Sequence, residues 1–448
     1  MPLTGIEIFK LLPKTNCGKC GVPTCLAFAM QLAAGKAELT ACPTVSEEAR
    51  AKLSEAAAPP IRLVTIGTGS RSLRVGGETV LFRHEKRFEN PPGLAILISD
   101  LLPDIEINAR ITKINSLRYE RVGLTLRPEL AAIKYESGKT ERFISVVDRV
   151  KKQSDCSIIL MSSDTGALSA ALKICADRKP LIYAATKDNA AQVADLAKEY
   201  NCPVAVRGEN LEEVMQLTDQ LGKSGIKDMV IDSGTRKLKK AFEDQIFIRK
   251  AALAKNRLFG FPTITFPCEM STDPMKEALI ASIFIAKYAG LIVLSNFDGH
   301  SLFPLLVERL NIYTDPQKPL ATKEGIYEIG GPGENSPVLI TSNFSLTYFI
   351  VSGEIENSKV PAYLLVKDTE GLSVMTAWAA GKFVADTIAQ FVKKSGIADK
   401  VKHRTLIIPG YAAQESGGLE EELPGWKIEV GPREASHIPA YLKNWKPA

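Results

Sequence analysis

Four cysteines near the N-terminus carry the most specific chemical signal in this sequence of 448 residues. They are Cys17, Cys20, Cys25 and Cys42, spaced as C-x2-C-x4-C-x16-C, and Pro43 follows the last of them. Four thiolates suit either a structural zinc ion or a [4Fe–4S] cluster. Zinc sites usually pair two C-x2-C units, and the second unit is missing here. The spacing therefore favours an iron–sulfur cluster, with zinc and free thiols as the alternatives.

The residues between these cysteines suit a cluster as well. Glycines at positions 18 and 21 let the backbone wrap closely and turn its N–H groups toward inorganic sulfides. A final Cys-Pro pair is typical of ferredoxin-type sequences. The motif indicates a one-electron carrier and leaves the destination of the electron open.

The other four cysteines need no special chemistry. Cys156, Cys175, Cys202 and Cys268 stand singly in apolar segments, where we expect small buried side chains. A secreted disulfide framework would be short and cysteine-dense, and this chain is neither.

Composition and charge exclude several classes of function. The chain is 45% hydrophobic, 24% charged and 7% aromatic, which is typical of globular proteins. Its 56 basic and 51 acidic residues are interspersed, without the basic runs of a nucleic-acid-binding protein. The N-terminus lacks the pattern of a signal peptide, and no apolar stretch approaches about 18 residues. We expect a cytoplasmic protein without nucleic-acid or membrane partners.

Three blocks of different pattern must position the chemical groups. Residues 1–58 hold the four cysteines and end in the string AAAPP (56–60). Residues 59–92 form a β-type linker, in which Gly76-Gly77 predicts a hairpin between RSLRV and ETVLF. We expect residues 56–92 to act as a mobile tether for the cluster domain.

The second block, residues 93–318, alternates short apolar runs with helical stretches. Uninterrupted apolar runs are expected for parallel strands that are buried on both faces. Eight runs over this length predict a (β/α)8 TIM-type barrel, with an open doubly wound sheet as the alternative. The predicted strands are 94–100, 119–125, 157–163, 180–186, 203–208, 228–234, 262–268 and 290–296.

The third block, residues 319–448, predicts a smaller doubly wound, flavodoxin-like α/β domain. Its expected strands are 338–343, 362–368, 404–410 and 426–431, and its clearest helix is 373–394. Ligands of such sheets bind beyond the carboxyl ends of the strands. Those ends are rich in Gly, Ser, Thr and Asn, and Ser373 or Thr376 could cap the following helix near a phosphate. Most strand-to-helix loops share this composition, so the pattern alone leaves the ligand open.

Polar residues also follow the last barrel strands. His300 lies beyond the final strand, on the face where barrel enzymes place catalytic residues. Asp232, Glu269, Asn296 and Asp298 would share that face. They indicate either a catalytic site or ordinary loop scaffolding.

The whole chain resembles the large (gamma) subunits of the corrinoid iron–sulfur proteins of the anaerobic acetyl-CoA (Wood–Ljungdahl) pathway and its decarbonylase–synthase complexes. The resemblance rests on the opening LTGIEIFKLLPKTNCGKCGVPTCLAFAMQLA, on KDTEGLSVMTAWAAGK (367–382) and on GPREASHIPAYL (431–442). Other cluster proteins share part of the opening, so the two C-terminal segments discriminate between families. The shared positions besides the cysteines are Asn16, Gly18, Gly21, Phe28, Ala29, Ala33 and Gly35.

The resemblance implies that the four cysteines hold a [4Fe–4S] cluster and that the third block binds a cobamide. The string Asp-x-His-x-x-Gly is absent, in agreement with a family whose cobamide is base-off and lacks a protein histidine ligand. His437 is accordingly expected to have a surface or packing role. No residue is expected to be catalytic, because the cobalt is the reacting centre. The implied cobamide contacts are Thr341, Thr347, Gly371, Leu372, Ser373, Val374, Gly431, Pro432, Arg433, and Thr376 near the lower face of cobalt.

The resemblance also implies a function and partners. The protein would be a methyl carrier, whose Co(I) accepts a methyl group from methyltetrahydrofolate, or an archaeal analogue, through a methyltransferase. It would pass the methyl group to acetyl-CoA synthase, while the cluster re-reduces Co(II) with electrons from a low-potential donor. A homologous small subunit would complete a heterodimer.

Three other readings of the sequence stay open. The chain could be an electron-transfer subunit of another redox complex without a cobamide. It could be a methyltransferase that binds a pterin at the barrel mouth. It could also be a zinc-stabilised interaction module.

Overall fold

The computed structural model describes residues 4–33, 37, 39–50, 53, 59–121 and 124–447. Gly35 of the cysteine pattern, residues 56–58 of the predicted tether and residues 122–123 of a predicted strand lie outside these described residues. The chain divides into two compact units. The first comprises residues 1–81, 88–117 and 128–312, and the second comprises 82–87, 118–127 and 313–448.

Two short helices carry the cysteine motif. They are α1 (Gly5–Leu11) and α2 (Cys25–Ala33), and the 3-10 turn η1 (Leu39–Ala41) follows them. The Thr4 hydroxyl accepts from the N–H of Glu7 while the Glu7 carboxylate accepts from the N–H of Thr4, so a capping box starts α1. A small core between the helices contains Ile8, Phe28 and Ala29 together with Cys25 and Cys42.

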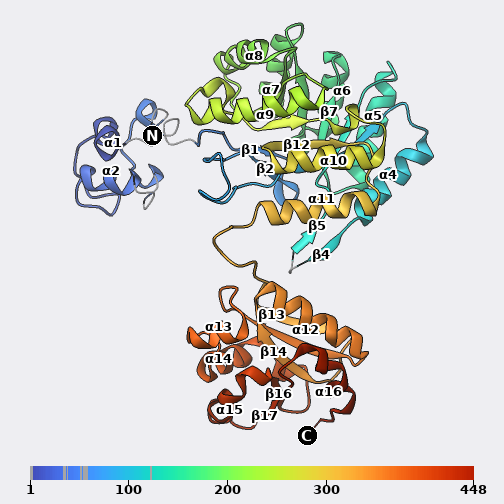
Figure 1. Cartoon of the computed structure of the whole chain (residues 1–448). Helices are drawn as coiled ribbons and strands as arrows, with labels where there is room; N and C mark the ends of the chain where they lie inside the picture. The colour runs from blue at the N-terminus through green and yellow to red at the C-terminus, as the bar shows by residue number, and fades with distance from the viewer. Residues whose placement is uncertain are drawn as a thin grey trace. The chain divides into compact units, whose positions relative to one another are not determined.

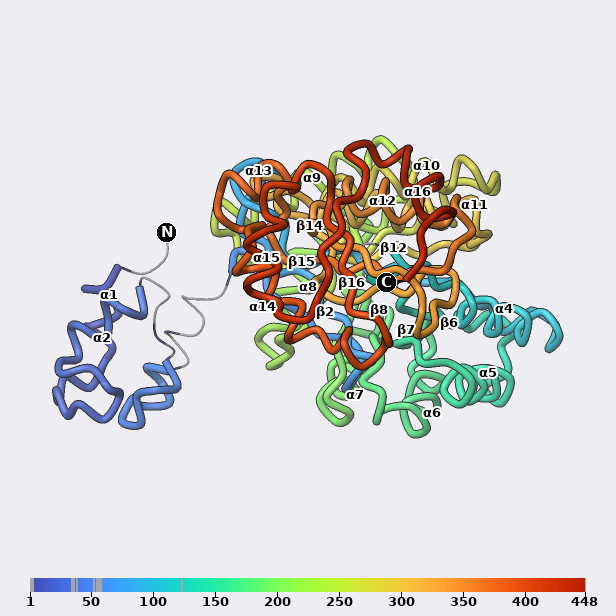
Figure 2. Tube along the Cα trace, turned by 90° about the horizontal axis from the view of Figure 1, so that it is seen from below, coloured from blue at the N-terminus to red at the C-terminus, as the bar shows by residue number. Residues whose placement is uncertain are grey.

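Eight parallel strands close into a barrel, as predicted, so the open-sheet alternative is wrong. Each strand is followed by a helix on the outside of the barrel (Figures 1 and 2). Every residue of β7, β8 and β12 is buried, which explains their uninterrupted apolar sequences. The strands are β3 (Gly93–Ser99), β6 (Leu130–Lys134), β7 (Ser157–Met161), β8 (Leu181–Ala185), β9 (Val204–Arg207), β10 (Met229–Asp232), β11 (Thr263–Thr265) and β12 (Ala289–Leu294). The helices are α4 (Asp104–Ser116), α5 (Thr140–Gln153), α6 (Thr165–Cys175), α7 (Ala190–Tyr200), α8 (Leu211–Lys223), α9 (Leu238–Leu253), α10 (Pro274–Ala286) and α11 (Gly299–Ile312).

One predicted barrel strand is wrong. Residues 119–125 do not enter the barrel, because β4 (Tyr119–Arg121) and β5 (Leu124–Leu126) pair with each other as an antiparallel hairpin. The second barrel strand is β6, a few residues later, which pairs with β3 and β7. Glu120 and Arg121 lie at the surface of the hairpin, whereas the first four residues of β6 are buried. The alanines of β6 made its apolar character weak in the sequence.

The hairpin expected at Gly76-Gly77 is also wrong. The connector instead pairs β1 (Val64–Ile66) with β2 (Leu73–Val75), and residues 78–82 form no strand. This earlier hairpin packs its buried Val64, Ile66 and Val75 against side chains of the barrel interior. It lies at the amino ends of the strands, where the Gly67 N–H donates to the Lys179 carbonyl and the Ser157 hydroxyl to the Arg71 carbonyl.

The rest of the connector is attached to the barrel as well. The buried Glu78 carboxylate accepts from the N–H groups of Glu89 and Asn90, and lies 3.6 Å from the Arg249 guanidinium of α9. The Tyr288 hydroxyl donates to the carbonyl of Leu81. Residues 59–81 are therefore part of the barrel body and cannot serve as a free tether.

The second unit contains a five-stranded sheet in the order β13-β15-β14-β16-β17. Four strands are parallel and β13 is an antiparallel edge strand, which gives the predicted doubly wound, flavodoxin-like architecture. The strands are β13 (Gly325–Ile329), β14 (Val338–Ser342), β15 (Ala362–Lys367), β16 (Thr405–Ile408) and β17 (Lys427–Val430).

Helices cover both faces of this sheet (Figure 1). On one face α12 (Ser345–Ser358) and α16 (Ile438–Asn444) pack together over a shared core. On the other face lie α13 (Val374–Ala379), α14 (Ala385–Ser395) and α15 (Ser416–Glu422). The single helix predicted over 373–394 is wrong, because Gly381 takes a left-handed φ of +70° and separates α13 from α14. Among the described helices, none combines the length and the apolar character needed to span a membrane.

Candidate functional site

The cysteine motif begins in the loop between α1 and α2. Cys17 and Cys20 lie in this loop, Cys25 is the first residue of α2, and Cys42 follows η1. Cys25 and Cys42 are 7% and 4% exposed, whereas Cys17 is exposed to solvent. The Asn16 side-chain oxygen accepts from the N–H of Cys25 at 2.8 Å and so fixes the start of α2 beside the loop. The motif therefore has a buried side and an exposed side.

Local hydrogen bonds favour the thiolate form of one cysteine. The backbone N–H of Lys19 and the hydroxyl of Thr15 lower the pKa of Cys17. The Thr44 hydroxyl also contacts Cys17 and lies 3.6 Å from the sulfur of Cys42. Thr44 thus contacts both the first and the last cysteine of the motif. Within the described ranges, no three Cys, His, Asp or Glu side chains lie close enough together to bind a single metal ion.

The glycines of the motif adopt the conformation that the sequence predicts. Gly18 and Gly21 have φ angles of +68° and +79°, which other residues rarely adopt. No atom lies within 4 Å of a β-carbon placed on either glycine. The backbone is therefore open at both positions, and the four thiols have the chemistry of iron–sulfur ligands.

A second candidate site is a cavity of about 330 Å³ in the C-terminal sheet. It lies at the carboxyl ends of β14 and β16, where the chain order of the sheet reverses direction and doubly wound folds bind their ligands. Seven of the ten predicted cobamide contacts line it: Thr341, Thr347, Ser373, Val374, Gly431, Pro432 and Arg433.

Three predicted contacts do not line this cavity. Gly371 has a φ of +77°, and a β-carbon there would lie 3.0 Å from Pro319. Leu372 packs against the core beneath α13 and α14. The Thr376 hydroxyl lies 3.0 Å from that of Ser373, so it reaches the cavity only through a neighbour.

Sequence reasoning did not select Asn343, which holds the loop of residues 368–371 that precedes the cavity-lining Ser373 and Val374. Its side-chain oxygen accepts from the Thr369 N–H at 3.0 Å, the Thr369 hydroxyl at 2.9 Å and the Gly371 N–H at 2.9 Å. Its side-chain nitrogen donates to Asp368 at 2.8 Å. The sequence signal was present, since Asn343 ends a buried strand, but its partners lie some 25 residues away. Apolar lining residues were missed as well, among them Ile350, Val351, Met375 and Ile438.

The cavity has polar groups that a ligand could bind. Thr341 is 1% exposed, and its hydroxyl has no hydrogen-bond partner among the described residues. A buried hydroxyl left unpaired costs about 1–3 kcal/mol, which a ligand that bonds to it would recover. Gly410 approaches the Gly431–Arg433 loop so closely that a β-carbon would lie 2.7 Å from the Arg433 nitrogen. The exposed Arg433 side chain provides a positive charge at the rim.

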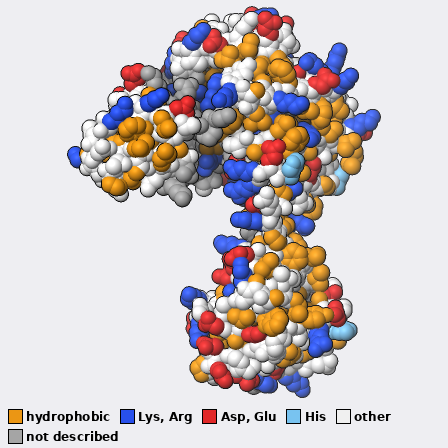
Figure 3. All heavy atoms as spheres, turned by 60° about the vertical axis from the view of Figure 1, so that its left-hand side comes forward, with side chains coloured by type: hydrophobic (Ala, Val, Ile, Leu, Met, Phe, Trp, Pro, Cys, Tyr) orange, Lys and Arg blue, Asp and Glu red, His pale blue; other side chains and the backbone are white. Residues whose placement is uncertain are grey.

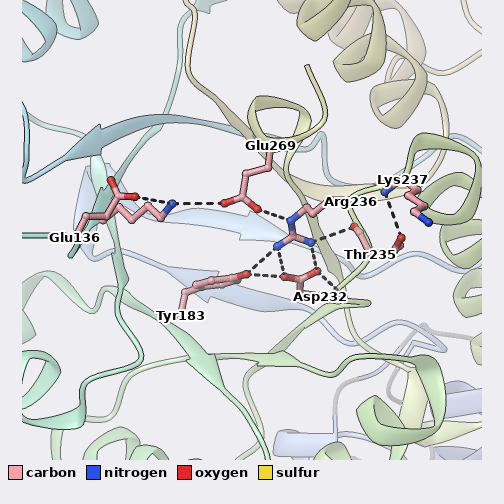
Figure 4. Close-up of polar contacts among 9 residues, drawn as sticks. Glu136, Tyr183, Asp232, Thr235, Arg236, Lys237 and Glu269 are labelled. Atoms are coloured by element: carbon pink, nitrogen blue, oxygen red, sulfur yellow. Dashed lines mark hydrogen bonds and ion pairs between the residues drawn. The ribbon is translucent and has the colours of Figure 1, made fainter. Parts of the chain in front are cut away.

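A polar network crosses the carboxyl end of the barrel (Figure 4). Arg236 binds both carboxylate oxygens of Asp232, at 3.0 and 2.9 Å, and its Nε donates to Glu269 at 2.5 Å. The Tyr183 hydroxyl donates to Asp232 at 2.6 Å. Burial, together with the negative charge of Asp232, raises the pKa of Tyr183. Beyond Glu269 the network continues through Lys134, which pairs with Glu136 at 2.9 Å.

The polar residues predicted on this face separate into two groups. Asp232 and Glu269 join through Arg236, whereas Asn296 accepts from the Asp298 N–H and Asp298 pairs with Lys113. The hydrogen bond from Lys113 lowers the pKa of Asp298. His300 is exposed at the start of α11. Each carboxylate is thus neutralised by a cation, which favours the scaffolding interpretation over a catalytic site.

The comparisons with known proteins cover nearly the whole chain. The family model described as "CO dehydrogenase/acetyl-CoA synthase delta subunit" matches residues 63–442, and one described as "Putative Fe-S cluster" matches residues 12–44. The chain is 48% identical over 444 residues to the "Corrinoid/iron-sulfur protein large subunit" of Moorella thermoacetica, covering 99% of each chain. It is 36% identical over 454 residues to the "Acetyl-CoA decarbonylase/synthase complex subunit gamma" of Methanothermobacter thermautotrophicus, also covering 99% of each.

A similar protein of Methanopyrus kandleri, with the same gamma-subunit name, is 35% identical over 453 residues and covers 98% of this chain and 97% of its own. The model of the first family starts after the cysteine motif and ends in α16. The second model spans all four cysteines. By its sequence, this chain belongs to the CO dehydrogenase/acetyl-CoA synthase delta subunit family.

Proposed function

We propose that this chain is the large, methyl-carrying subunit of a corrinoid iron–sulfur protein in the anaerobic acetyl-CoA pathway. The observation that carries the proposal is its similarity over full length to a protein of that name, at 48% identity. Two structural features support it: the four-cysteine motif, and the cavity whose lining includes most of the residues that the resemblance indicated for a cobamide.

In this proposal residues 1–58 form a domain that binds a [4Fe–4S] cluster. The cluster ligands would be Cys17, Cys20, Cys25 and Cys42. Residues 59–92, of which 59–81 pack on the barrel, would connect it to the barrel of residues 93–318, and residues 319–448 would bind the cobamide. The Thr341 hydroxyl would bond to the cobamide, and Thr347 and Arg433 would contact its polar edge. The Asn343 side chain holds the Thr369–Gly371 backbone, and the cavity-lining Ser373 and Val374 that follow it would contact the cofactor.

The bound cobamide would supply a cobalt centre that accepts a methyl group and gives it up again, and the cluster would supply single electrons to restore the reactive cobalt. None of the residues that line the cavity is a histidine. This supports the proposal of a base-off cofactor without a protein ligand. Thr376, whose hydroxyl lies 3.0 Å from that of the cavity-lining Ser373, would act on the cofactor through that neighbour. A weak lower ligand makes reduction of the cobalt easier, because Co(I) prefers low coordination.

The proposal includes partners. A methyltransferase would deliver the methyl group from a methyltetrahydropterin, and acetyl-CoA synthase would receive it. A homologous small subunit would complete the heterodimer in the cytoplasm. The carboxylates of Asp232, Glu269 and Asp298 at the barrel mouth are each paired with a cation, which supports a separate methyltransferase.

The decisive test is metal analysis with a visible spectrum, on protein purified without oxygen and co-expressed with its small subunit in the presence of cobamide. We expect about four irons per chain, one cobalt and a corrinoid absorption. Iron without cobalt after reconstitution would favour the electron-transfer alternative. Zinc with no colour would favour an interaction module.

A pair of variants sharpens the metal assignment. Cys25→Ser should remove most of the iron and leave the cobalt, because the cluster and the cavity belong to different parts of the chain. Cys156→Ser is the matched control, since Cys156 is equally buried but lies beside the Pro128 carbonyl in the barrel. Equal loss of iron in both variants would contradict the assignment.

A further inference from the structure

One short helix contributes a wall of the C-terminal cavity. Ser373, Val374 and Met375 line the cavity, and the last two of them begin α13. Met375 is exposed, so this wall borders the solvent. Figure 3 shows hydrophobic side chains gathered on the visible face of the C-terminal unit, in the lower part of the view. A helix of six residues is not stable by itself, so the position of α13 depends on its contacts with the rest of the fold.

The contacts of α13 are apolar on its inner side and polar at its end. Val374 and Ala377 belong to the core beneath the helix. Nε1 of Trp378, which is 37% exposed, donates to the Glu415 carboxylate at 2.7 Å. In the described part of the chain, no other side chain of α13 hydrogen-bonds to a different element. This bond is therefore the directional contact that fixes the end of α13.

Glu415 connects α13 to two further segments. It is the last residue of η7 (Gly410–Glu415), the 3-10 segment that follows β16. Its second carboxylate oxygen accepts from the N–H of Ala385 at 2.7 Å, and Ala385 begins α14. That N–H belongs to the first turn of the helix, where no acceptor is available within the helix itself. One side chain thus holds α13, α14 and η7 together.

The segment η7 is anchored at the cavity independently of Glu415. Tyr411 lines the cavity, and its hydroxyl donates at 2.8 Å to Glu434, which lines the cavity too. The N–H of Gly410 donates to the Pro432 carbonyl at 3.2 Å. Glu415 therefore ties α13 to a part of the cavity wall that has its own attachments.

We infer that Glu415 is a positioning residue for the cofactor of this cavity. Through Trp378 it holds α13 where Ser373, Val374 and Met375 line the cavity, although neither Glu415 nor Trp378 lines the cavity itself. A wall that is already in place binds a ligand more tightly, because less has to be ordered on binding. The inference rests on the proposed function, because it takes a cobamide as the ligand.

The test uses the full chain with its small subunit and compares two tryptophan variants. Trp378→Phe removes the hydrogen-bond donor and keeps an aromatic ring. Trp445→Phe is the matched control, because the Trp445 indole also donates to a carboxylate of the same unit, that of Glu429 at 2.9 Å. Trp445 does not line the cavity.

Two measurements follow the position of α13 and its effect on the ligand. Without cobamide, Trp378→Phe should speed amide hydrogen exchange at Ala377 and Ala380 about fivefold, because α13 opens more often. Absorbance titration with cobamide should give an apparent affinity about threefold lower, because only molecules with α13 in place bind tightly. Trp445→Phe should change neither quantity.

A second variant tests the acceptor. Glu415→Ala should lower the cobamide affinity at least as much as Trp378→Phe, because it also frees the start of α14. The double variant Trp378→Phe/Glu415→Ala should bind cobamide as weakly as Glu415→Ala alone, because both substitutions remove the same bond.

Several results would overturn the inference. Unchanged exchange and affinity in Trp378→Phe would do so, as would an equal loss of affinity in Trp445→Phe or additive losses in the double variant. Faster exchange with unchanged affinity would show that the bond supports the fold without acting on the cofactor. If even the unaltered protein binds no cobamide, the proposed function is overturned, while the exchange of the protein without cofactor still tests how α13 is held.

Discussion

The unpaired Thr341 hydroxyl predicts that its removal stabilises the protein without cofactor and weakens the binding of the cofactor. Thr341→Val replaces the hydroxyl by a methyl group of similar shape at a position that is 1% exposed. The empty protein then no longer buries an unpaired polar group, whose cost is about 1–3 kcal/mol. We expect the variant to be about 1 kcal/mol more stable without cofactor, and the melting temperature of the C-terminal unit to rise by about 3 °C.

With cobamide present the order should reverse. The valine cannot bond to the cofactor, so binding should lose about 1 kcal/mol, which corresponds to an affinity roughly fivefold lower. Calorimetric unfolding of the empty chain and absorbance titration with base-off cobamide measure the two effects. Thr347→Val is the control, because the partly exposed Thr347 hydroxyl can bond to water and its removal should not stabilise the empty protein.

Either of two results would refute this reasoning. If Thr341→Val destabilises the empty protein, the hydroxyl has a partner there, such as a buried water. If the affinity for cobamide is unchanged, the hydroxyl does not face the cofactor.

Three further predictions follow from buried polar contacts. In Asn343→Ala the N–H groups of Thr369 and Gly371 lose their acceptor, so their amide hydrogens should exchange faster and cobamide should bind more weakly. Glu370→Gln on the same loop is the control. It removes only an exposed ion pair with Lys382, and should change neither the amide exchange nor the cobamide affinity. Arg236→Met leaves Asp232 buried with only Tyr183 as a side-chain partner and should destabilise the barrel by about 3 kcal/mol in urea unfolding; a loss below 1 kcal/mol would show that the network contributes little. Burial raises the pKa of Glu78 above 4.5, so the folded state gains stability from its protonation at low pH and loses it as the pH rises through the raised pKa. Glu78→Gln should remove this part of the pH dependence, and an identical pH profile for the variant and the unaltered protein would contradict the assignment.

Much of the fold could be predicted because burial on both faces leaves a clear pattern. Strands such as β7 and β12 are uninterrupted apolar runs, and eight of them over the length of the second block indicated a barrel. The strand β6 was missed because its two alanines are residues that strands contain rarely, while the nearby hairpin of β4 and β5 resembled a strand. The break between α13 and α14 depends on one glycine whose left-handed conformation a sequence does not display.

The candidate site was predictable to the extent that it follows strand ends. Thr341 and Gly431–Arg433 line the cavity because parallel strands bring their carboxyl ends to one edge. The contacts of Asn343 and Arg236 were not predictable, since each joins loops that are distant in sequence. Both contacts depend on the direction in which the side chain points. That direction is set by tertiary packing, which a local sequence pattern does not indicate.

The network at the barrel mouth has an evolutionary consequence. Because Arg236 binds two acidic side chains at once, replacing Arg236 leaves the buried Asp232 without its cation. Selection would then tolerate a change at position 236 only together with a change at its acidic partners, at positions 232 and 269. We expect substitutions at these three positions to be correlated among distant relatives. Substitutions of the exposed His300 should be independent of them.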